Sequence, residues 1–294
     1  MVVAPLMISE SRLLNIISRS PIGSIHRSGS IGLFRIILVY HGVQANHAAC
    51  LEPNIFDQHM KYIKHVHAVR PLNNLFCDEQ HKTMSSDFRL TIAITFDDAF
   101  KNFYQYVLPL LIELDLPATL YAPVNFLGRC NEWDKGKSID LLPIMTSQEL
   151  REISSAGIEV GSHGLNHKRL SLLSNSEMMK EVYDSKVMLE DMLGTPIKSF
   201  SYPHGGRRDY NKYTVEAVKK AGYETAVTTR FGRFNCLKER FELKRIIISP
   251  TDTLEVLKAK LLGRYDWLEI KERLVHQWRY VSKDKQSCFK MHNA

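Results

Sequence analysis

The sequence has few of the features that mark secreted, membrane-spanning or nucleic-acid-binding proteins. Its five cysteines are far apart in 294 residues and form no Cys-x-x-Cys pair, which favours a reducing compartment over a disulfide framework. The apolar stretch at residues 31–40 contains Arg35 and is too short to cross a bilayer. The net charge of +7 is spread along the chain without a polybasic block, so nucleic-acid binding has little support.

The first residues also lack the pattern of a secretory signal. Residues 1–8 are apolar, but no basic segment precedes them and Pro5 interrupts them, so we expect a cytoplasmic protein. Residues 11–18 have the pattern of a short amphipathic helix, which either packs on the folded domain or makes a peripheral membrane contact. We expect no transmembrane segment, and the oligomeric state is left open.

The sequence does contain short apolar runs that end in polar residues. Residues 90–96 are apolar and β-branched without a helical period, as in a strand buried on both faces of a parallel sheet. Asp97 and Asp98 follow at once, at the carboxyl end of the strand, where α/β folds place their chemistry. An Asp-rich turn or helix cap is the simpler alternative.

A second run, residues 158–162, leads to His163 and His167. If residues 163–167 form a helical turn, both imidazoles lie on one face and can bind one metal ion. Such a pair also occurs by chance on surface helices. Combined with a carboxylate from the first strand, it makes a three-ligand set that leaves one zinc position open for water.

Strand-like and helix-like segments alternate along the chain. Seven strands are predicted between residues 35 and 249, and only the link over residues 230–244 lacks a clear helix. This alternation predicts an α/β fold, a distorted (β/α) barrel with about seven parallel strands. We expect an N-terminal extension over residues 1–34, the barrel domain over residues 35–250, and a C-terminal helix with a basic tail over residues 251–294.

A third run leads into residues 201–206, which form a Pro/Gly turn. With this turn, the sequence resembles the polysaccharide deacetylases of the NodB-homology type, also called carbohydrate esterase family 4. Residues 95–98 match the family's Thr-Phe-Asp-Asp motif, residues 163–167 its His-Ser/Thr-x-x-His motif, and residues 201–205 stand at its third motif. The motifs occur in the family's order, and the resemblance covers residues 36–249.

The resemblance implies a hydrolase that removes N-acetyl groups from an amino-sugar polysaccharide or related glycan, which would be the partner of this protein. Asp98, His163 and His167 would hold one divalent metal ion, with Zn²⁺ as first choice and Co²⁺, Ni²⁺ or Mn²⁺ also tolerated by these ligands. Asp97, beside the ligand, would take a proton from the attacking water.

Three positions depart from the family pattern, and one of them is His204, which stands where the third motif usually has tyrosine. Gly164 replaces the usual Ser or Thr, so a hydroxyl that braces the loop is missing. Ser201 stands where the third motif usually has arginine, which leaves the catalytic base without its partner. We predict that Arg245 pairs with Asp97 instead, because the link before it, about fifteen residues, is near the minimum of a parallel crossover and keeps the chain near the site. Pairing of Arg245 with a surface acid is the alternative.

The proton donor to the leaving amine has no clear match to the family's Leu-x-His block. We predict His204, because a histidine titrates near neutral pH, and its backbone N–H after Pro203 would help to hold the oxyanion. His276 has the spacing of the block, but charged residues precede it, as on a solvent-exposed helix.

Four further residues are predicted to contact the substrate. Tyr202 and Pro203 belong to the third motif, His41 follows the first barrel strand, and Trp133 lies in the long loop over residues 124–143. His41 is equally well explained as a capping or packing residue, and Trp133 as a buried anchor of its loop.

Two other functions fit the sequence. A catalytically degenerate glycan-binding or scaffold protein would explain the loss of the motif arginine. A hydrolase of a small cyclic amide would keep the metal ion and change the substrate, since related barrels host such enzymes.

Overall fold

The computed structural model describes residues 35–76, 90–137 and 140–276. The chain divides into two compact units, Gly32–Leu254 and, from its two ends, Met1–Ile31 with Glu255–Ala294. The structure describes residues 255–276 of the second unit. Helix α7 (Leu254–Leu261) begins at the last residue of the first unit and otherwise belongs to the second. Within the described residues, no helix is both long and apolar enough to span a membrane.

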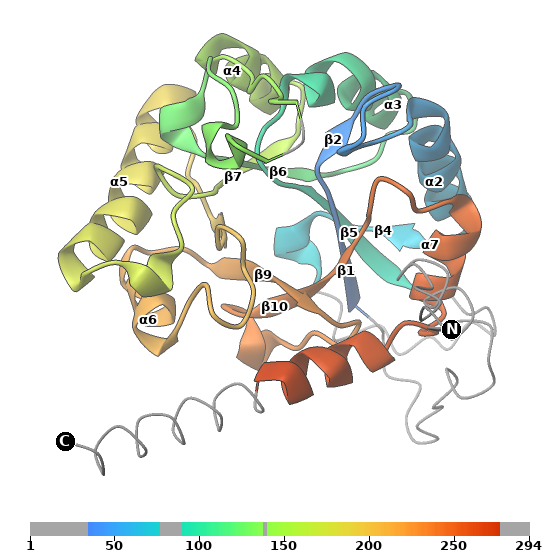
Figure 1. Ribbon diagram of the computed structural model, residues 1–294. Coiled ribbons are helices and arrows are strands. Elements are labelled where there is room, and N and C mark those ends of the chain that lie inside the picture. The colour runs from blue at the N-terminus through green and yellow to red at the C-terminus, as the bar shows by residue number, and fades with distance from the viewer. Residues whose placement is uncertain (1–34, 77–89, 138–139, 277–294) are drawn as a thin grey trace, which may run out of the picture. The chain divides into compact units, whose positions relative to one another are not determined.

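Seven parallel strands of the first unit close into a barrel (Figure 1). The order around the barrel is β1, β10, β9, β8, β7, β6, β5, and β5 pairs again with β1 along its full length. This confirms the predicted (β/α) barrel with about seven parallel strands. The strands are β1 (Arg35–Tyr40), β5 (Thr91–Phe96), β6 (Thr119–Ala122), β7 (Glu159–Ser162), β8 (Ser199–Ser201), β9 (Thr225–Phe231) and β10 (Leu243–Ile247).

Helices cover the outside of the barrel in Figure 1. Thr146 and Ser174 begin α4 and α5 with capping boxes, as their Ser/Thr-x-x-Glu sequences predict, and Gly194 ends α5 in a left-handed conformation. The helices of this unit are α2 (Pro53–Val66), α3 (Leu108–Glu113), α4 (Ser147–Ser155), α5 (Asn175–Leu193) and α6 (Lys212–Lys220). Two short strands, β2 (Gly42–Val43) and β3 (Cys50–Leu51), pair separately.

The helical segment after the Asp pair consists of two parts. A π-helical turn, Phe103–Val107, precedes α3. Pro109 has no N–H and cannot donate to the carbonyl four residues earlier, so the wider turn lies where the regular ladder is interrupted.

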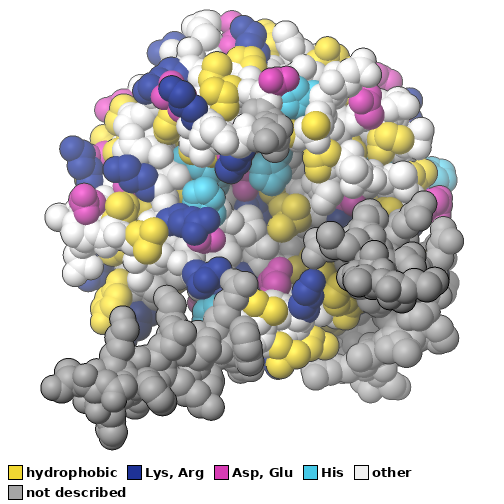
Figure 2. Space-filling model, viewed as in Figure 1, with side chains coloured by type: hydrophobic (Ala, Val, Ile, Leu, Met, Phe, Trp, Pro, Cys, Tyr) yellow, Lys and Arg dark blue, Asp and Glu magenta, His cyan; other side chains and the backbone are white. Residues whose placement is uncertain are grey.

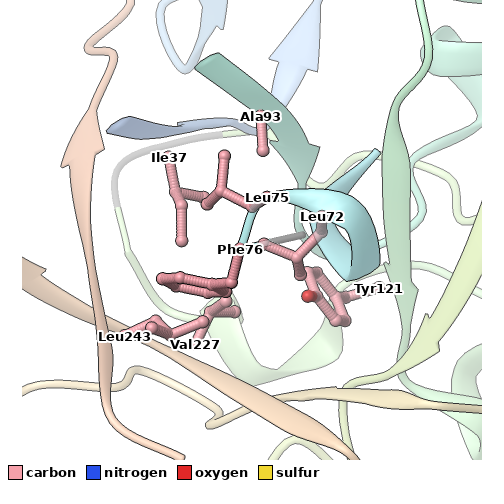
Figure 3. Close-up of a cluster of buried hydrophobic side chains, with 8 residues drawn as sticks. All are labelled: Ile37, Leu72, Leu75, Phe76, Ala93, Tyr121, Val227 and Leu243. Carbon is pink, nitrogen blue, oxygen red and sulfur yellow. The ribbon is translucent and has the colours of Figure 1, made fainter. Parts of the chain in front are cut away.

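The amino-terminal end of the barrel is closed by a segment that the sequence did not reveal. The two-residue strand β4 (Ala68–Val69) pairs with the beginning of β5, below the point where β6 pairs with its end. Leu72, Leu75 and Phe76 follow β4 and point into the barrel interior (Figure 3). They pack there against buried side chains of five strands, namely Ile37, Ala93, Tyr121, Val227 and Leu243. We call Leu72, Leu75 and Phe76 the apolar plug. Because the plug fills the amino-terminal end of the barrel, polar groups are found at the carboxyl ends of the strands.

One glycine tests how tightly the barrel interior is filled. Gly161 lies beside Tyr121 in register, and a Cβ there would come within 2.4 Å of the Tyr121 ring and 2.8 Å of Ser199 Oγ. Because Tyr121 is fully buried and has no room to move, we expect Gly161→Ala to lower the free energy of unfolding by ~1–3 kcal/mol in urea titrations. A loss below ~0.5 kcal/mol would mean that the interior has spare volume.

Candidate functional site

Polar side chains gather at the carboxyl ends of β5, β7 and β8. Asp97 and Asp98 follow β5, His163 follows β7, and Ser201 ends β8. Histidine side chains group near the centre of this face in the space-filling view (Figure 2). Parallel strands bring their carboxyl ends to one edge of the barrel, so residues far apart in sequence meet there.

Asp98, His163 and His167 form a buried cluster with the geometry of a metal centre. One ligand atom from each lies within 4.8 Å of the others, and Asp98 Oδ1 is 3.5 Å from His163 Nε2 and 3.3 Å from His167 Nε2. Ligands about 2.1 Å from a tetrahedral zinc ion are about 3.4 Å apart, so the spacing fits. Asp98 Oδ1 is buried and accepts no hydrogen bond of ordinary geometry from the described residues. An ion would satisfy it.

Electrostatics favour the ligand form of the carboxyl group. Burial raises the pKa of Asp98, but contacts with His163 and His167 outweigh it and hold the pKa well below its usual range. His163 Nδ1 lies 2.8 Å from the Ser201 carbonyl oxygen, which can only accept, so Nδ1 donates and Nε2 is the ring nitrogen turned towards Asp98.

The two histidines are not brought together by a helical turn, and that part of the sequence prediction is wrong. Residues 163–167 form an irregular loop, with Gly164 at φ +74° and His167 at φ +51°. Positive φ recurs at Asp98, Ala99 and His204. Four of the six described non-glycine residues with positive φ therefore lie in the loops of this site, where backbone strain is commonly concentrated.

Arg245 and Asp97 form a buried ion pair. The Nη1 and Nη2 atoms of Arg245 donate to Asp97 Oδ1 and Oδ2 at 2.8 and 2.6 Å. Its Nε donates to the Thr228 carbonyl oxygen at 2.7 Å, and the Nη atoms also donate to the hydroxyl groups of Thr95 and Ser201 at 3.2 and 3.1 Å. All five N–H groups of a guanidinium with no exposed surface are therefore used.

The ion pair sets the charge of Asp97. Burial alone would raise the pKa of this carboxyl group, but the positive charges of Arg245 and His163 outweigh burial, and the pKa is lowered. His41, half-buried nearby, acts in the same direction on both Asp97 and Asp98. Asp97 is therefore a carboxylate at neutral pH.

His204 differs from its prediction. Its ring centroid is 4.7 Å from that of His167, and burial, followed by the positive charges of His167 and Arg169, lowers the pKa of His204 to about 4. The expectation that this histidine titrates near neutral pH is therefore wrong. The cause is its place against a ligand histidine, which the sequence does not show.

Of the predicted substrate contacts, the one assigned to Tyr202 is contradicted by the structure. Its side chain is fully buried, its hydroxyl donates to the Phe241 carbonyl oxygen at 2.9 Å, and its ring stacks on Tyr210 at 4.5 Å. Pro203 is also buried. The turn at residues 201–206 thus directs the Tyr202 side chain into the protein interior. His276, the alternative acid, belongs to the second unit.

Trp133 is half-buried and stacks on His167, with ring centroids 4.1 Å apart and an angle of 23° between the planes. Phe126 meets the indole edge-on at 4.8 Å. One face of the indole is therefore taken by a residue of the candidate metal centre, which favours the interpretation of Trp133 as an anchor of its loop.

Sequence reasoning missed Glu181 on α5. This side chain is only 4% exposed and bonds to the loop between the ligand histidines. A signal was present, because Glu181 and Ser185 share the buried stripe of α5 with Met178, Val182 and Leu189. A charged residue on the apolar face of an amphipathic helix needs a buried partner.

Comparison with known sequences agrees with the three motifs. Residues 88–226 match the family model for polysaccharide deacetylases. The Bacillus subtilis protein YxkH, provisionally assigned as a polysaccharide deacetylase, is 28% identical over 216 residues, which are 73% of this chain and 71% of that protein. The peptidoglycan-N-acetylglucosamine deacetylase of Bacillus cereus is 30% identical over 137 residues, 46% of this chain and 55% of that protein.

Solved structures show the same fold. The Streptococcus pyogenes deacetylase PplD, in complex with acetate, superposes with a TM-score of 0.63 at 24% identity, covering 77% of this chain and 97% of that one. IcaB from Ammonifex degensii superposes with a TM-score of 0.62 at 18% identity, covering 79% of this chain and 98% of that one. At these identities the likeness establishes the barrel fold.

The Arg245–Asp97 pair can be tested through stability. Arg245→Met keeps the length of the side chain but leaves Asp97 buried without its cation, so we expect a loss of about 3–5 kcal/mol in the free energy of unfolding at pH 7. Adding Asp97→Asn removes the unpaired charge and should restore part of the loss. If the single variant loses less than ~1 kcal/mol in urea titrations, the pair does not hold the barrel together.

Proposed function

We propose that this protein, whose residues 88–226 match the family model for polysaccharide deacetylases, is a metal-dependent hydrolase that removes N-acetyl groups from an amino-sugar polysaccharide or related glycan. The observation that carries the proposal is the buried cluster of Asp98, His163 and His167 beside the ionised Asp97. The Bacillus cereus relative is named for N-acetylglucosamine in peptidoglycan, which makes this sugar the first substrate to test.

In this proposal, Asp98, His163 and His167 hold one divalent ion, with Zn²⁺ as first choice. An ion held there would lower the pKa of a water molecule and polarise the acyl oxygen. His163 would bind the ion as a neutral ring, and its Nδ1 hydrogen bond to the Ser201 carbonyl oxygen orients it for this role. Burial of all three ligands keeps competing water away from them.

Asp97 is the proposed base. Hydrolysis takes one proton from the attacking water and gives one to the leaving amine. Arg245 fixes the Asp97 carboxylate in two-point contact and keeps it in the ionised form that can accept a proton. Because the pKa of Asp97 is lowered, its protonated form gives the proton up more readily than an ordinary aspartic acid, and we propose that Asp97 passes the proton on to the amine.

The role of His204 is then confined to its backbone. A ring with a pKa of about 4 is neutral at pH 7 and has no proton of suitable acidity to give. The His204 N–H, in the turn after Pro203, remains the proposed donor to the developing oxyanion. Of the predicted sugar contacts, the half-buried His41 is kept as the proposed one.

The degenerate glycan-binding protein rested on the missing motif arginine. Arg245 meets Asp97 in a bidentate pair from another strand, so that departure no longer argues for lost activity. Purified protein incubated with N-acetylglucosamine oligomers and each of Zn²⁺, Co²⁺, Ni²⁺ and Mn²⁺ should release acetate. If it binds metal ions but releases acetate from no acetylated glycan, the binding protein or the cyclic amide hydrolase becomes the better explanation.

The ligand set has a direct test. Asp98→Asn, His163→Ala and His167→Ala should each lose most of the bound metal, since each removes one of three protein ligands. Metal per chain is measured after dialysis, with the exposed His65→Ala on α2 as the control that should keep it. Stoichiometric metal in any one of the three variants would exclude that residue as a ligand.

Asp97→Asn should separate proton transfer from metal binding. Asparagine keeps the size and polarity of the side chain but cannot accept the proton, so we expect metal content to stay and turnover to fall by ~10²–10⁴-fold. The two quantities are read from the same preparation by metal analysis and acetate release. Turnover close to that of the unchanged protein would rule out Asp97 as the base.

A further inference from the structure

The loop that joins the two ligand histidines is hydrogen-bonded at each residue despite its irregular shape. On one side, the backbone N–H groups of Val124 and Asn125 donate to the carbonyl oxygens of Gly164 and Leu165 at 3.1 and 3.0 Å. On the other side, the loop's own N–H groups need acceptors. Because a loop without regular structure cannot supply them, they must come from a neighbouring element.

Helix α5 supplies those acceptors through one carboxylate. Glu181 Oε2 accepts the backbone N–H groups of Leu165 and Asn166 at 3.0 and 2.9 Å, and Oε1 accepts Asn166 Nδ2 at 2.6 Å. Three donors compensate for placing the carboxylate in the interior, where it is only 4% exposed. The side chain therefore clamps the middle of the loop.

One turn further along α5, Ser185 extends the same support. Its hydroxyl accepts from Ser162 Oγ at 2.8 Å, and Ser162 Oγ in turn accepts the Gly164 N–H at 3.1 Å. Glu181 and Ser185 are four residues apart and lie on one face of the helix. Every loop N–H from Gly164 to Asn166 is thus bound through this face of α5.

The two ligand histidines depend on the loop to different degrees. His163 has its own support, since its Nδ1 is bound by the Ser201 carbonyl oxygen at 2.8 Å. His167 Nδ1 is buried and finds no hydrogen-bond partner among the described residues. The ring of His167 is held by its stack on Trp133, by its edge contacts with the His163 and His204 rings and by the backbone that carries it. Without a hydrogen bond at Nδ1, the position of His167 depends more on the loop than that of His163 does.

We propose that Glu181 is a positioning residue for the metal centre and replaces the missing loop hydroxyl at Gly164. The left-handed backbone of Gly164 does not suit a Ser or Thr, and a Cβ there would lie 3.5 Å from Glu181 Oε2. The brace therefore comes from the helix beside the loop. The inference rests on the proposed metal centre, and it concerns the placement of His167 within it.

Glu181→Gln tests the clamp with little change of shape. The amide cannot accept from all three donors, so the loop should loosen and the affinity for Zn²⁺, measured by competition with a chromophoric chelator, should fall about 10–100-fold. The absorption bands of bound Co²⁺ should also change, because they report the arrangement of the ligands. Removing a purely structural hydrogen bond would leave the Co²⁺ bands as they are.

Glu190→Gln is the matched control. Glu190 lies on the same helix, accepts the Ile197 N–H at 2.9 Å and pairs with Lys186, away from the loop. It should lower the melting temperature without changing Zn²⁺ affinity or the Co²⁺ spectrum. If Glu181→Gln does not fold, Asn166→Ala takes its place, because it removes the Nδ2 contact with Glu181. We expect this variant to bind Zn²⁺ severalfold more weakly than the unchanged protein.

Two results would overturn the inference separately from the function. If the unchanged protein binds Zn²⁺ and Glu181→Gln, or Asn166→Ala in its place, binds within twofold with the same Co²⁺ spectrum, Glu181 does not position the site while the proposed centre stands. If the unchanged protein binds neither ion, the metal centre fails, and the proposed function and this inference fail with it.

Discussion

The pairing of Arg245 with Asp97 is the constraint on which the rest of the barrel interior depends. A guanidinium without exposed surface is stable only when its charge is matched and each N–H is bound. The N–H groups of Arg245 are bound by side-chain or backbone oxygens of β5, β8 and β9 and by the Asp97 carboxylate, which follows β5. The strands are thereby held in one register around a group that also fixes the charge and direction of the proposed base.

The barrel was accessible from the sequence because buried parallel strands and capped helices leave strong local patterns. The pairing of Arg245 with Asp97 was also within reach, since the missing motif arginine and the short link before β10 point to the same residue. The loop at His163 and the environment of His204 were not, because they arise from positive φ angles and from ring contacts between distant segments. The strand β4 was too short to leave a pattern, and Tyr202 was placed by resemblance while its hydroxyl is bound in the interior.

Two of the departures from the family motifs, those at Ser201 and Gly164, share one physical explanation. In each, a group lost from a motif has a counterpart of suitable chemistry on a different element: Arg245 on β10 where Ser201 lacks a cation, and, in our proposal, Glu181 on α5 where Gly164 lacks a hydroxyl. What the site requires is a charge or an acceptor at a point in space. A motif read along the chain records only one way of supplying it.

The apolar plug after β4 makes the barrel blind at its amino-terminal end. Leu72, Leu75 and Phe76 fill the interior between the strands there, so nothing passes through the barrel from end to end. Water, substrate and both products of any reaction at Asp97 must therefore use the same opening. In the proposed reaction, a polymer lies across that opening without threading through it, and the small acid released beneath the bound sugar has to leave past the sugar or wait for it to depart.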